Sequence, residues 1–255
     1  MRYIEYEKNI NSDNPFNIVL GEKEDGTKYS INLCDAPHIL LAGCTGSGKS
    51  VLINSILLSI MNNCSPSLAK FILVDYKMVE FSCMNDSKYL YMPIINHENK
   101  SLEMLNQVYD LMEERYRLLS DLKVRNLKEY NKVAKEPLPY LFVVFDEVAF
   151  YGEKKYEFEE KISKIIQKSR AAGIHFILGT QRPSMLKFSA SFKANIPTRI
   201  CLRVVTLEDS KIMLGCSGGE SLEHKGLCII KDSCGKMNKV LTYYVNECEF
   251  EKYLR

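Results

Sequence analysis

Residues 43–50 read GCTGSGKS and lie between two apolar segments. The segment that leads into them, residues 38–43, has the continuous apolarity of a strand buried on both faces. The segment that follows, VLINSILLSIM, reads as a helix. A glycine-rich turn between a buried strand and a helix matches the phosphate-binding pattern GxxxxGK(S/T) in the context that this pattern requires. The feature predicts an α/β fold that holds a nucleoside triphosphate.

The residues of this turn have separate expected tasks. The glycines let backbone N–H groups bend around phosphate oxygens, and the start of the following helix adds its dipole. Lys49 is expected to reach the β- and γ-phosphates, and Ser50 to ligate Mg²⁺. The predicted nucleotide-binding residues are Gly43, Cys44, Thr45, Gly46, Ser47, Gly48, Lys49, Ser50 and Val51. ATP and Mg²⁺ are therefore the predicted ligands.

A second apolar run, residues 140–147, ends in the acidic pair Asp146 and Glu147. Open α/β sheets display their ligand-binding groups at the carboxyl ends of strands. Asp146 is expected to hold the Mg²⁺ shell, and Glu147 to polarise the water that attacks the γ-phosphate. An acidic strand end that only caps a helix is the alternative. The adjacent pair favours hydrolysis over simple nucleotide sensing.

Gln181 and several arginines are further candidates for phosphate contacts. Gln181 follows the apolar run 174–180 and is expected to touch the γ-phosphate, although a polar turn residue is the alternative. An arginine from a neighbouring subunit would neutralise charge in the transition state. Arg115, Arg117 and Arg170 lie on predicted helices, and spacing alone does not choose among them. Most surface arginines are merely solvated or salt-bridged.

The remaining chain alternates between short apolar runs and segments with helical periodicity. Strands are predicted at residues 70–75, 140–147, 174–180, 198–205 and 226–230, and helices at residues 101–119 and 156–172. Strand followed by helix, repeated, predicts a mostly parallel sheet flanked by helices. Residues before Pro37 alternate around a Gly/Asp turn instead. We therefore expect a β-hairpin appendage in residues 1–36 and an ATPase domain in residues 37–255.

Composition narrows the remaining possibilities. Nine scattered cysteines include no CxxC pair, which favours a reducing cytoplasm and predicts neither a zinc ribbon nor a disulfide scaffold. No apolar run approaches the roughly 20 residues of a membrane helix. Residues 181–240 carry ten basic and five acidic side chains. A solvated face and an anion-binding surface both fit that excess.

Taken in order, these segments resemble the motor domain of the FtsK/SpoIIIE DNA translocases. The resemblance runs from about residue 15 to residue 230 and rests on PHILLAGCTGSGKSVLIN, VDYKMVEFS, LPYLFVVFDEVA, KSRAAGIHFILGTQRPS and KANIPTRICLRV. It implies a RecA-like P-loop NTPase core, an ATP-driven ring of six subunits and double-stranded DNA threaded through the pore. By motif position it implies Walker A roles for Lys49 and Ser50, Walker B roles for Asp146 and Glu147, a sensor role for Gln181 and a trans-acting role for Arg170.

The resemblance also implies a DNA-contact region. Arg182, Lys193, Arg199 and Lys211 resemble the pore-facing residues of the family, whose cations would meet DNA phosphates without reading base sequence. The positive excess of residues 181–240 then favours DNA binding over a solvated face. Transfer of DNA in conjugation, in segregation or by a mobile element is the implied process.

This sequence departs from the family pattern in several places. Family members usually have DPK where this chain has Asp75, Tyr76 and Lys77, and tyrosine does not fix φ as proline does. These 255 residues show no counterpart of the family's membrane helices, linker, first motor subdomain or winged-helix tail, and we expect any membrane recruitment to use an anchored partner. Two alternatives stay open: an ATPase of the type VII secretion kind that moves polypeptide, and a nucleotide-dependent assembly module.

Overall fold

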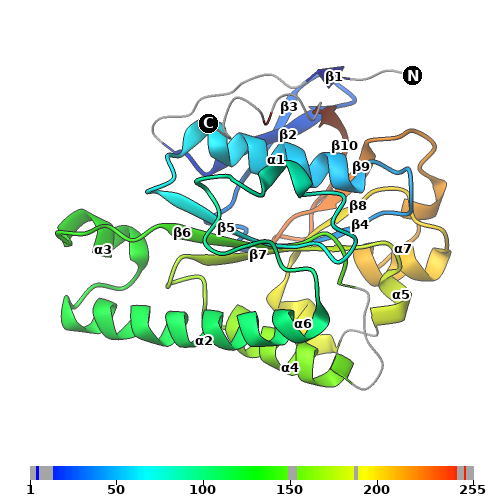
Figure 1. Ribbon diagram of the computed structural model, residues 1–255. Helices are drawn as coiled ribbons and strands as arrows, with labels where there is room; N and C mark the ends of the chain where they lie inside the picture. The colour runs from blue at the N-terminus through cyan, green and yellow to red at the C-terminus, as the bar shows by residue number, and fades with distance from the viewer. Residues whose placement is uncertain (1–3, 6–13, 149–153, 187–188, 246–249, 251–255) are drawn as a thin grey trace.

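The computed structural model describes residues 4–5, 14–148, 154–186, 189–245 and 250, and within them it forms one mixed sheet (Figure 1). The strands are β1 (Ile4–Glu5), β2 (Asn17–Lys23), β3 (Lys28–Asn32), β4 (His38–Ala42), β5 (Ala69–Val74), β6 (Tyr140–Phe145), β7 (Ile174–Thr180), β8 (Thr198–Cys201), β9 (Leu227–Lys231) and β10 (Met237–Tyr244). Their order across the sheet is β3-β2-β10-β9-β8-β4-β7-β6-β5, and β1 pairs with β10.

Helices cover both faces of this sheet (Figure 1). They are α1 (Lys49–Asn63), α2 (Glu98–Asp121), α3 (Leu127–Val133), α4 (Lys155–Ile166), α5 (Pro183–Leu186), α6 (Ala190–Asn195) and α7 (Leu207–Leu214), with 3₁₀ turns at Ser82–Met84 and Gly219–Ser221. Helix α1 lies on one face, and α2 and α4 lie on the other. No helix of the described residues is long and apolar enough to span a bilayer.

The parallel part of the sheet is the predicted core. Strands β8, β4, β7, β6 and β5 are parallel neighbours in that order. Side chains alternate between the faces of a strand, so Ile39 and Leu41 pack in the cluster that contains α1, while Leu40 and Ala42 pack in the cluster that contains α2 and α4. Burial on both faces explains the continuous apolar runs. The predicted RecA-like P-loop fold, with a mostly parallel core flanked by helices, is confirmed.

The hairpin predicted before Pro37 is present as β2 and β3. It continues the main sheet, because β2 pairs antiparallel with β10, which the sequence did not indicate as a strand. Residues 1–3 and 6–13 of the predicted appendage lie outside the described part of the chain. The boundary between residues 36 and 37 stays a prediction.

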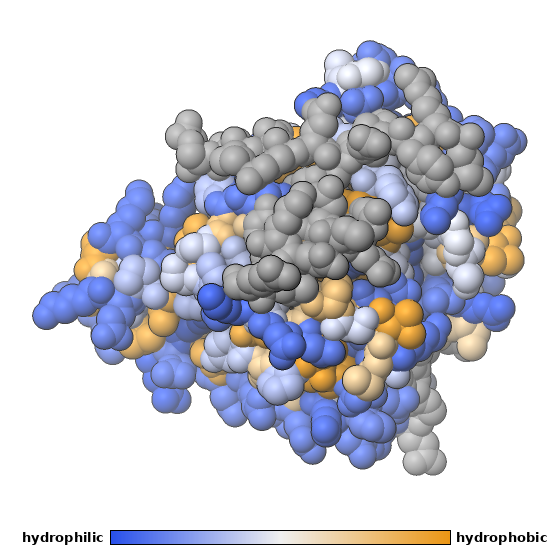
Figure 2. Space-filling view, turned by 45° about the horizontal axis from the view of Figure 1, so that its top comes forward, coloured by the Kyte–Doolittle hydropathy of each residue, from blue (hydrophilic) through white to orange (hydrophobic). Residues whose placement is uncertain are grey.

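Two predicted elements end earlier than expected. The helix predicted to reach residue 172 ends at Ile166, because the chain then makes tight turns and enters β7 through Gly173, whose φ is 68°. The strand predicted to reach residue 205 ends at Cys201. On the face that Figure 2 shows, exposed hydrophobic residues lie in small groups among hydrophilic ones, which is ordinary for a protein surface.

Candidate functional site

The glycine-rich turn connects β4 to α1, and its backbone needs glycine at two positions. Gly46 has φ 79° and Gly48 has φ 103°, both in the left-handed region that side chains disfavour. Gly48 also lies against the chain before β9: a Cβ atom on it would stand 3.1 Å from the nitrogen of Gly226. The N–H of Gly226 donates to the carbonyl of Ser47 at 2.8 Å. The entry to β9 therefore braces the turn.

A cavity of about 210 Å³ opens at this turn. Its lining combines the turn and the first residues of α1 with side chains from three other parts of the chain, namely Glu80, Gln181 and Lys225. The space therefore lies at the carboxyl ends of β4 and β7, as expected for ligand binding in an α/β sheet.

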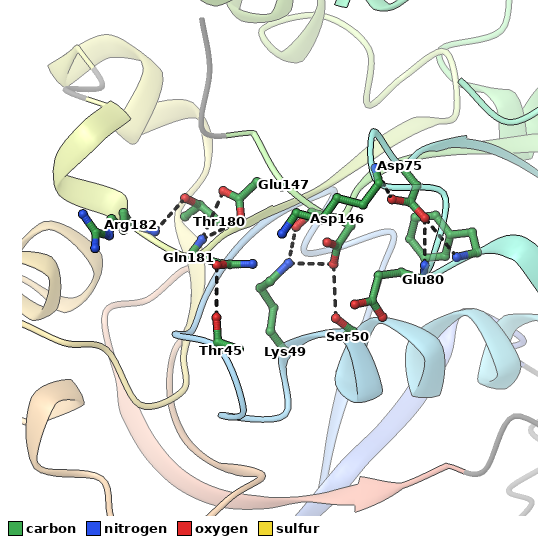
Figure 3. A network of polar contacts seen from close by, with 12 residues as sticks. Thr45, Lys49, Ser50, Asp75, Glu80, Asp146, Glu147, Thr180, Gln181 and Arg182 are labelled. Carbon is green, nitrogen blue, oxygen red and sulfur yellow. Dashed lines mark hydrogen bonds and ion pairs between the residues drawn. The ribbon is translucent and has the colours of Figure 1, made fainter. Parts of the chain in front are cut away.

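Lys49 and Asp146 meet behind the turn (Figure 3). The ammonium of Lys49 donates to Oδ1 of Asp146 at 2.6 Å and also to the main-chain carbonyl of Asp146. The hydroxyl of Ser50 donates to the same Oδ1 at 3.4 Å. The structure thus brings the predicted phosphate-binding lysine together with both predicted metal ligands.

Glu147 and Gln181 form a second contact between neighbouring strands (Figure 3). The main-chain N–H of Gln181 lies 3.1 and 3.0 Å from the two carboxylate oxygens of Glu147. The side-chain oxygen of Gln181 accepts from the hydroxyl of Thr45 at 3.3 Å. Gln181 therefore joins the phosphate-binding turn to the carboxylate predicted to act on water.

Gly179 permits the close approach of these two strand ends. A Cβ atom at Gly179 would lie 2.3 Å from the main-chain oxygen of Asp146, a distance that a methyl group cannot occupy. The sequence shows this glycine in GTQRP but does not show what it faces.

Glu80 was not predicted, and the structure places it in the cavity beside Ser50 (Figure 3). It lies on the loop that follows β5, so the rule that ligand groups gather at strand ends was the available signal. Burial and, after it, the negative charge of Asp146 raise the pKa of the Glu80 carboxyl, against a hydrogen bond from Ser50 that lowers it.

Lys225 was also missed. It lies two residues before β9, at the amino end of a strand, where no ligand group is expected in a parallel sheet. Strand β9 runs antiparallel to β8, however, so its amino end lies at the same edge as the carboxyl ends of the parallel strands. Strand direction is what brings Lys225 into the cavity.

The three candidate arginines all lie away from this cavity. Arg115 is buried and donates to the carbonyls of Ala172 at 2.7 Å and Pro139 at 2.8 Å. Burial lowers its pKa to about 10. These contacts give Arg115 a structural task between α2 and the entries to β6 and β7. Arg117 is exposed on α2.

Arg170 lies at the other end of β7 from Gln181. Its Nε donates to the carbonyl of Cys34 at 3.1 Å, and its guanidinium is 3.5 Å from the carboxylate of Asp35. The seven residues of β7 separate Arg170 from Gln181, which corresponds to roughly 20 Å at the usual strand rise. Arg170 therefore cannot reach the cavity of its own chain.

The four predicted DNA-contact residues fall into two groups. Arg182 and Lys211 are exposed, and Lys193 is half-buried. Arg199 instead donates to main-chain carbonyls of Lys193 at 2.7 Å, Ile196 at 3.3 Å, Met213 at 3.3 Å and Ile212 at 3.5 Å. Burial lowers its pKa. Arg199 thus ties the end of α6 to the end of α7, a task that spacing did not indicate.

Comparisons with known proteins identify the family. The FtsK/SpoIIIE family model matches residues 1–185. The DNA translocase FtsK of Streptococcus agalactiae is 40% identical over 236 residues, which is 88% of this chain and 29% of that protein. The DNA translocase FtsK of Campylobacter jejuni is 38% identical over 250 residues, 95% of this chain and 26% of that protein. The chain thus spans less than a third of either relative.

Solved structures show the same fold. The pCW3 conjugation coupling protein TcpA, in its monomer form with ATPγS, aligns with a TM-score of 0.85 and 27% identity over 99% of this chain and 72% of that one. The cytoplasmic domain of the Thermomonospora curvata type VII secretion ATPase EccC aligns with a TM-score of 0.79 and 26% identity, over 93% of this chain and 30% of that one. On the family match and the identity to both translocases, the chain belongs to the FtsK/SpoIIIE family.

Proposed function

We propose that this chain is the ATP-hydrolysing motor domain of a double-stranded DNA translocase. The observation that carries the proposal is the contact of Asp146 with Lys49 and Ser50, two residues that line a cavity at the glycine-rich turn, where a triphosphate is expected. Two relatives of about 40% identity that are named DNA translocases support DNA as the cargo. TcpA, described as a conjugation coupling protein with ATPγS, supports both nucleotide and process.

The residues around the cavity fit a complex of ATP with Mg²⁺. A hydroxyl and a carboxylate oxygen are the hard ligands that Mg²⁺ prefers, and those of Ser50 and Asp146 already lie within 3.4 Å of each other. When bound, the ion would neutralise charge on the phosphates. Lys49 would exchange its contact with Asp146 for phosphate oxygens. Lys225 adds a second positive charge to the lining.

Glu147 is the proposed general base. It directly follows Asp146, and its carboxylate contacts the backbone of Gln181, which lines the cavity. Its contact with the backbone of Gln181, and the contact of Gln181 with Thr45, would let the γ-phosphate influence the loop that leads into α5. That loop carries Arg182, which we propose as a DNA contact. One short segment would therefore link the state of the γ-phosphate to the contact with DNA.

We propose a ring of subunits, six by the family pattern, in which Arg170 acts on the nucleotide of a neighbouring subunit. Because Arg170 lies at the far end of β7, it can act on a nucleotide only in a neighbouring subunit. Mixing inactive Lys49→Ala subunits with inactive Arg170→Ala subunits should then restore part of the turnover, because each kind supplies what the other lacks. Failure at every mixing ratio would remove Arg170 from this role.

The proposed DNA contacts are Arg182, Lys193 and Lys211, with Arg199 holding the helices α6 and α7 that carry two of them. These contacts would be made to phosphates, so binding would depend steeply on salt and weakly on sequence.

The deciding experiment measures ATP hydrolysis with double-stranded DNA, with single-stranded DNA, with polypeptide and without cargo, beside the oligomeric state by sizing. We expect hydrolysis to rise with double-stranded DNA in a ring-sized fraction. Stimulation by polypeptide alone would favour the secretion alternative, which the likeness to EccC keeps in view. Nucleotide-dependent assembly without turnover would favour the assembly module instead.

A further inference from the structure

The cavity contains a carboxylate that neither Walker motif supplies. Glu80 lines it, and in Figure 3 its side chain lies beside Ser50 on the side away from Gln181. Among the described residues that line the cavity, Glu80 is the one that carries a carboxylate. The position of Glu80 therefore needs an explanation of its own.

The loop that carries Glu80 is held in place by a buried aspartate at the end of β5. Asp75 is 2% exposed and accepts from the N–H groups of Lys77 at 3.0 Å, Glu80 at 2.8 Å and Phe81 at 3.3 Å. An aspartate that gathers several backbone N–H groups fixes a turn rigidly. Here it fixes the backbone of Glu80 itself.

Tyr76 adds a second anchor to the same loop. Its hydroxyl shares a hydrogen bond of 2.6 Å with the hydroxyl of Ser101 on α2. Tyrosine stands where relatives usually have proline, and it does not fix φ. The side-chain bond to α2 restrains the loop in another way, so both Asp75 and Tyr76 hold the segment that carries Glu80.

Negative charge gathers at this corner of the site. Asp146 and Glu80 flank Ser50, and Asp75 lies close enough to Glu80 to oppose its ionisation. The ammonium of Lys49 compensates the charge of Asp146 through their ion pair. A divalent cation bound by oxygen atoms of Ser50, Asp146 and Glu80 would compensate the remaining negative charge.

We propose that Glu80 is a third protein group of the magnesium site, a carboxylate that positions the ion together with Ser50 and Asp146. The proposal rests on the nucleotide-binding function proposed above. It assigns to the loop after β5 a task that the two Walker motifs do not include. It also explains why that loop is anchored twice.

Metal affinity, measured apart from turnover, tests this assignment. Mn²⁺ serves as the probe, followed by its electron paramagnetic resonance signal during titration of the full chain with ATPγS. We expect Glu80→Gln to weaken Mn²⁺ binding about tenfold, within the range found when a group supporting a metal site is removed. Asp146→Asn is the positive reference, and Glu136→Gln, which changes an exposed glutamate of the α3–β6 loop, is the matched control.

Nucleotide binding in EDTA separates this proposal from the proposed function. Wild type and Glu80→Gln should bind a fluorescent ATP analogue equally without metal, and Mg²⁺ should tighten binding less in the variant. If wild type binds no nucleotide, the proposed function fails and Glu80 is not the cause. If Glu80→Gln binds Mn²⁺ as tightly as Glu136→Gln does, the proposal is overturned, even where hydrolysis is slow. If Glu80→Gln does not fold, Glu80→Asp is the second variant, because it keeps the negative charge on a shorter side chain. We expect Glu80→Asp to weaken Mn²⁺ binding as well. Mn²⁺ binding with wild-type affinity in Glu80→Asp would overturn the assignment.

Discussion

The ammonium of Lys49 donates to Oδ1 of Asp146 at 2.6 Å, and the two side chains are 5% and 7% exposed. Lys49 begins α1, which follows β4, and Asp146 follows β6, so the ion pair joins the ends of two strands that lie on either side of β7. Both charges are away from water and each depends on the other for compensation. The pair therefore matters to the stability of the protein as well as to its ligand.

Lys49→Ala should lower stability and remove nucleotide binding together. Breaking a buried ion pair by removing one partner costs about 3–5 kcal/mol, because the other charge is left uncompensated. Asp146→Asn in the same chain should recover part of that loss, since it removes the stranded charge. Urea unfolding of the two variants and wild type measures this. Equal destabilisation by the single and the double change would contradict the pairing.

Glu147→Gln should keep nucleotide binding and slow hydrolysis by a factor of about 10² or more, since a general base contributes on that scale. The amide keeps an oxygen that can accept from the N–H of Gln181, so the local contact survives. Single-turnover hydrolysis and equilibrium binding of ATP separate the two effects. Glu160→Gln, at an exposed position of α4, is the control. Hydrolysis at the wild-type rate in Glu147→Gln would remove Glu147 from the role of base.

The sequence predicted the site residues that belong to local motifs and missed those that the tertiary fold brings to the cavity. The glycine-rich turn, Asp146 and Glu147 directly follow buried strands, so apolar runs and the position of polar residues after them were sufficient to predict the site there. Lys225 reaches the cavity because β9 runs antiparallel, and no pattern in its own segment shows direction. Glu80 needs the anchoring of its loop by Asp75, which lies five residues away and is buried.

The basic residues show that the sequence also failed to separate exposed side chains from structural ones. Charge and spacing treated Arg182 and Arg199 alike, because a sequence shows that a guanidinium is present and not what it contacts. Arg199 uses its donors on main-chain carbonyls of two helix ends. Arg182 is exposed after β7. The distinction depends on how α6 and α7 pack, which is a tertiary property.

Arg182→Ala and Arg199→Ala should therefore fail in different ways. Arg182→Ala should leave the unfolding midpoint unchanged, weaken binding to double-stranded DNA of any sequence, and reduce the slope of log affinity against log salt by about 1. Arg199→Ala should lower stability by about 2–3 kcal/mol, because several partly buried main-chain carbonyls lose the donor that they share. Thermal unfolding and DNA titrations at several salt concentrations measure both. A normal unfolding midpoint in Arg199→Ala would contradict its structural task.

Two histidines inside the sheet make stability depend on pH. His38 on β4 and His175 on β7 are both about 2% exposed. The ring of His175 stacks on Phe142 with centroids 5.2 Å apart and on Tyr140 with centroids 5.9 Å apart. Burial lowers the pKa of His38 to about 3 and that of His175 to about 4, from an ordinary value of 6.5. Both rings are therefore neutral in the folded protein at neutral pH.

The unfolded chain takes up protons on these rings below pH 6.5, whereas the folded chain resists until about pH 4 at His175 and about pH 3 at His38. Unfolding is thus coupled to proton uptake, and the free energy of unfolding falls as the pH falls from 6.5 toward 4. Each histidine contributes about 1.4 kcal/mol per pH unit in that window.

His175→Phe should reduce the slope of unfolding free energy against pH by one such contribution, because phenylalanine keeps the stacking and binds no proton. His224→Gln, at an exposed position, should leave the slope as it is. Urea unfolding between pH 4.5 and 7.5 measures the free energy of unfolding of each variant and of wild type. In the difference between variant and wild type, the contribution of carboxylates that titrate in the same range cancels. An unchanged slope in His175→Phe would mean that His175 already carries its proton in the folded protein, against its burial among aromatic rings.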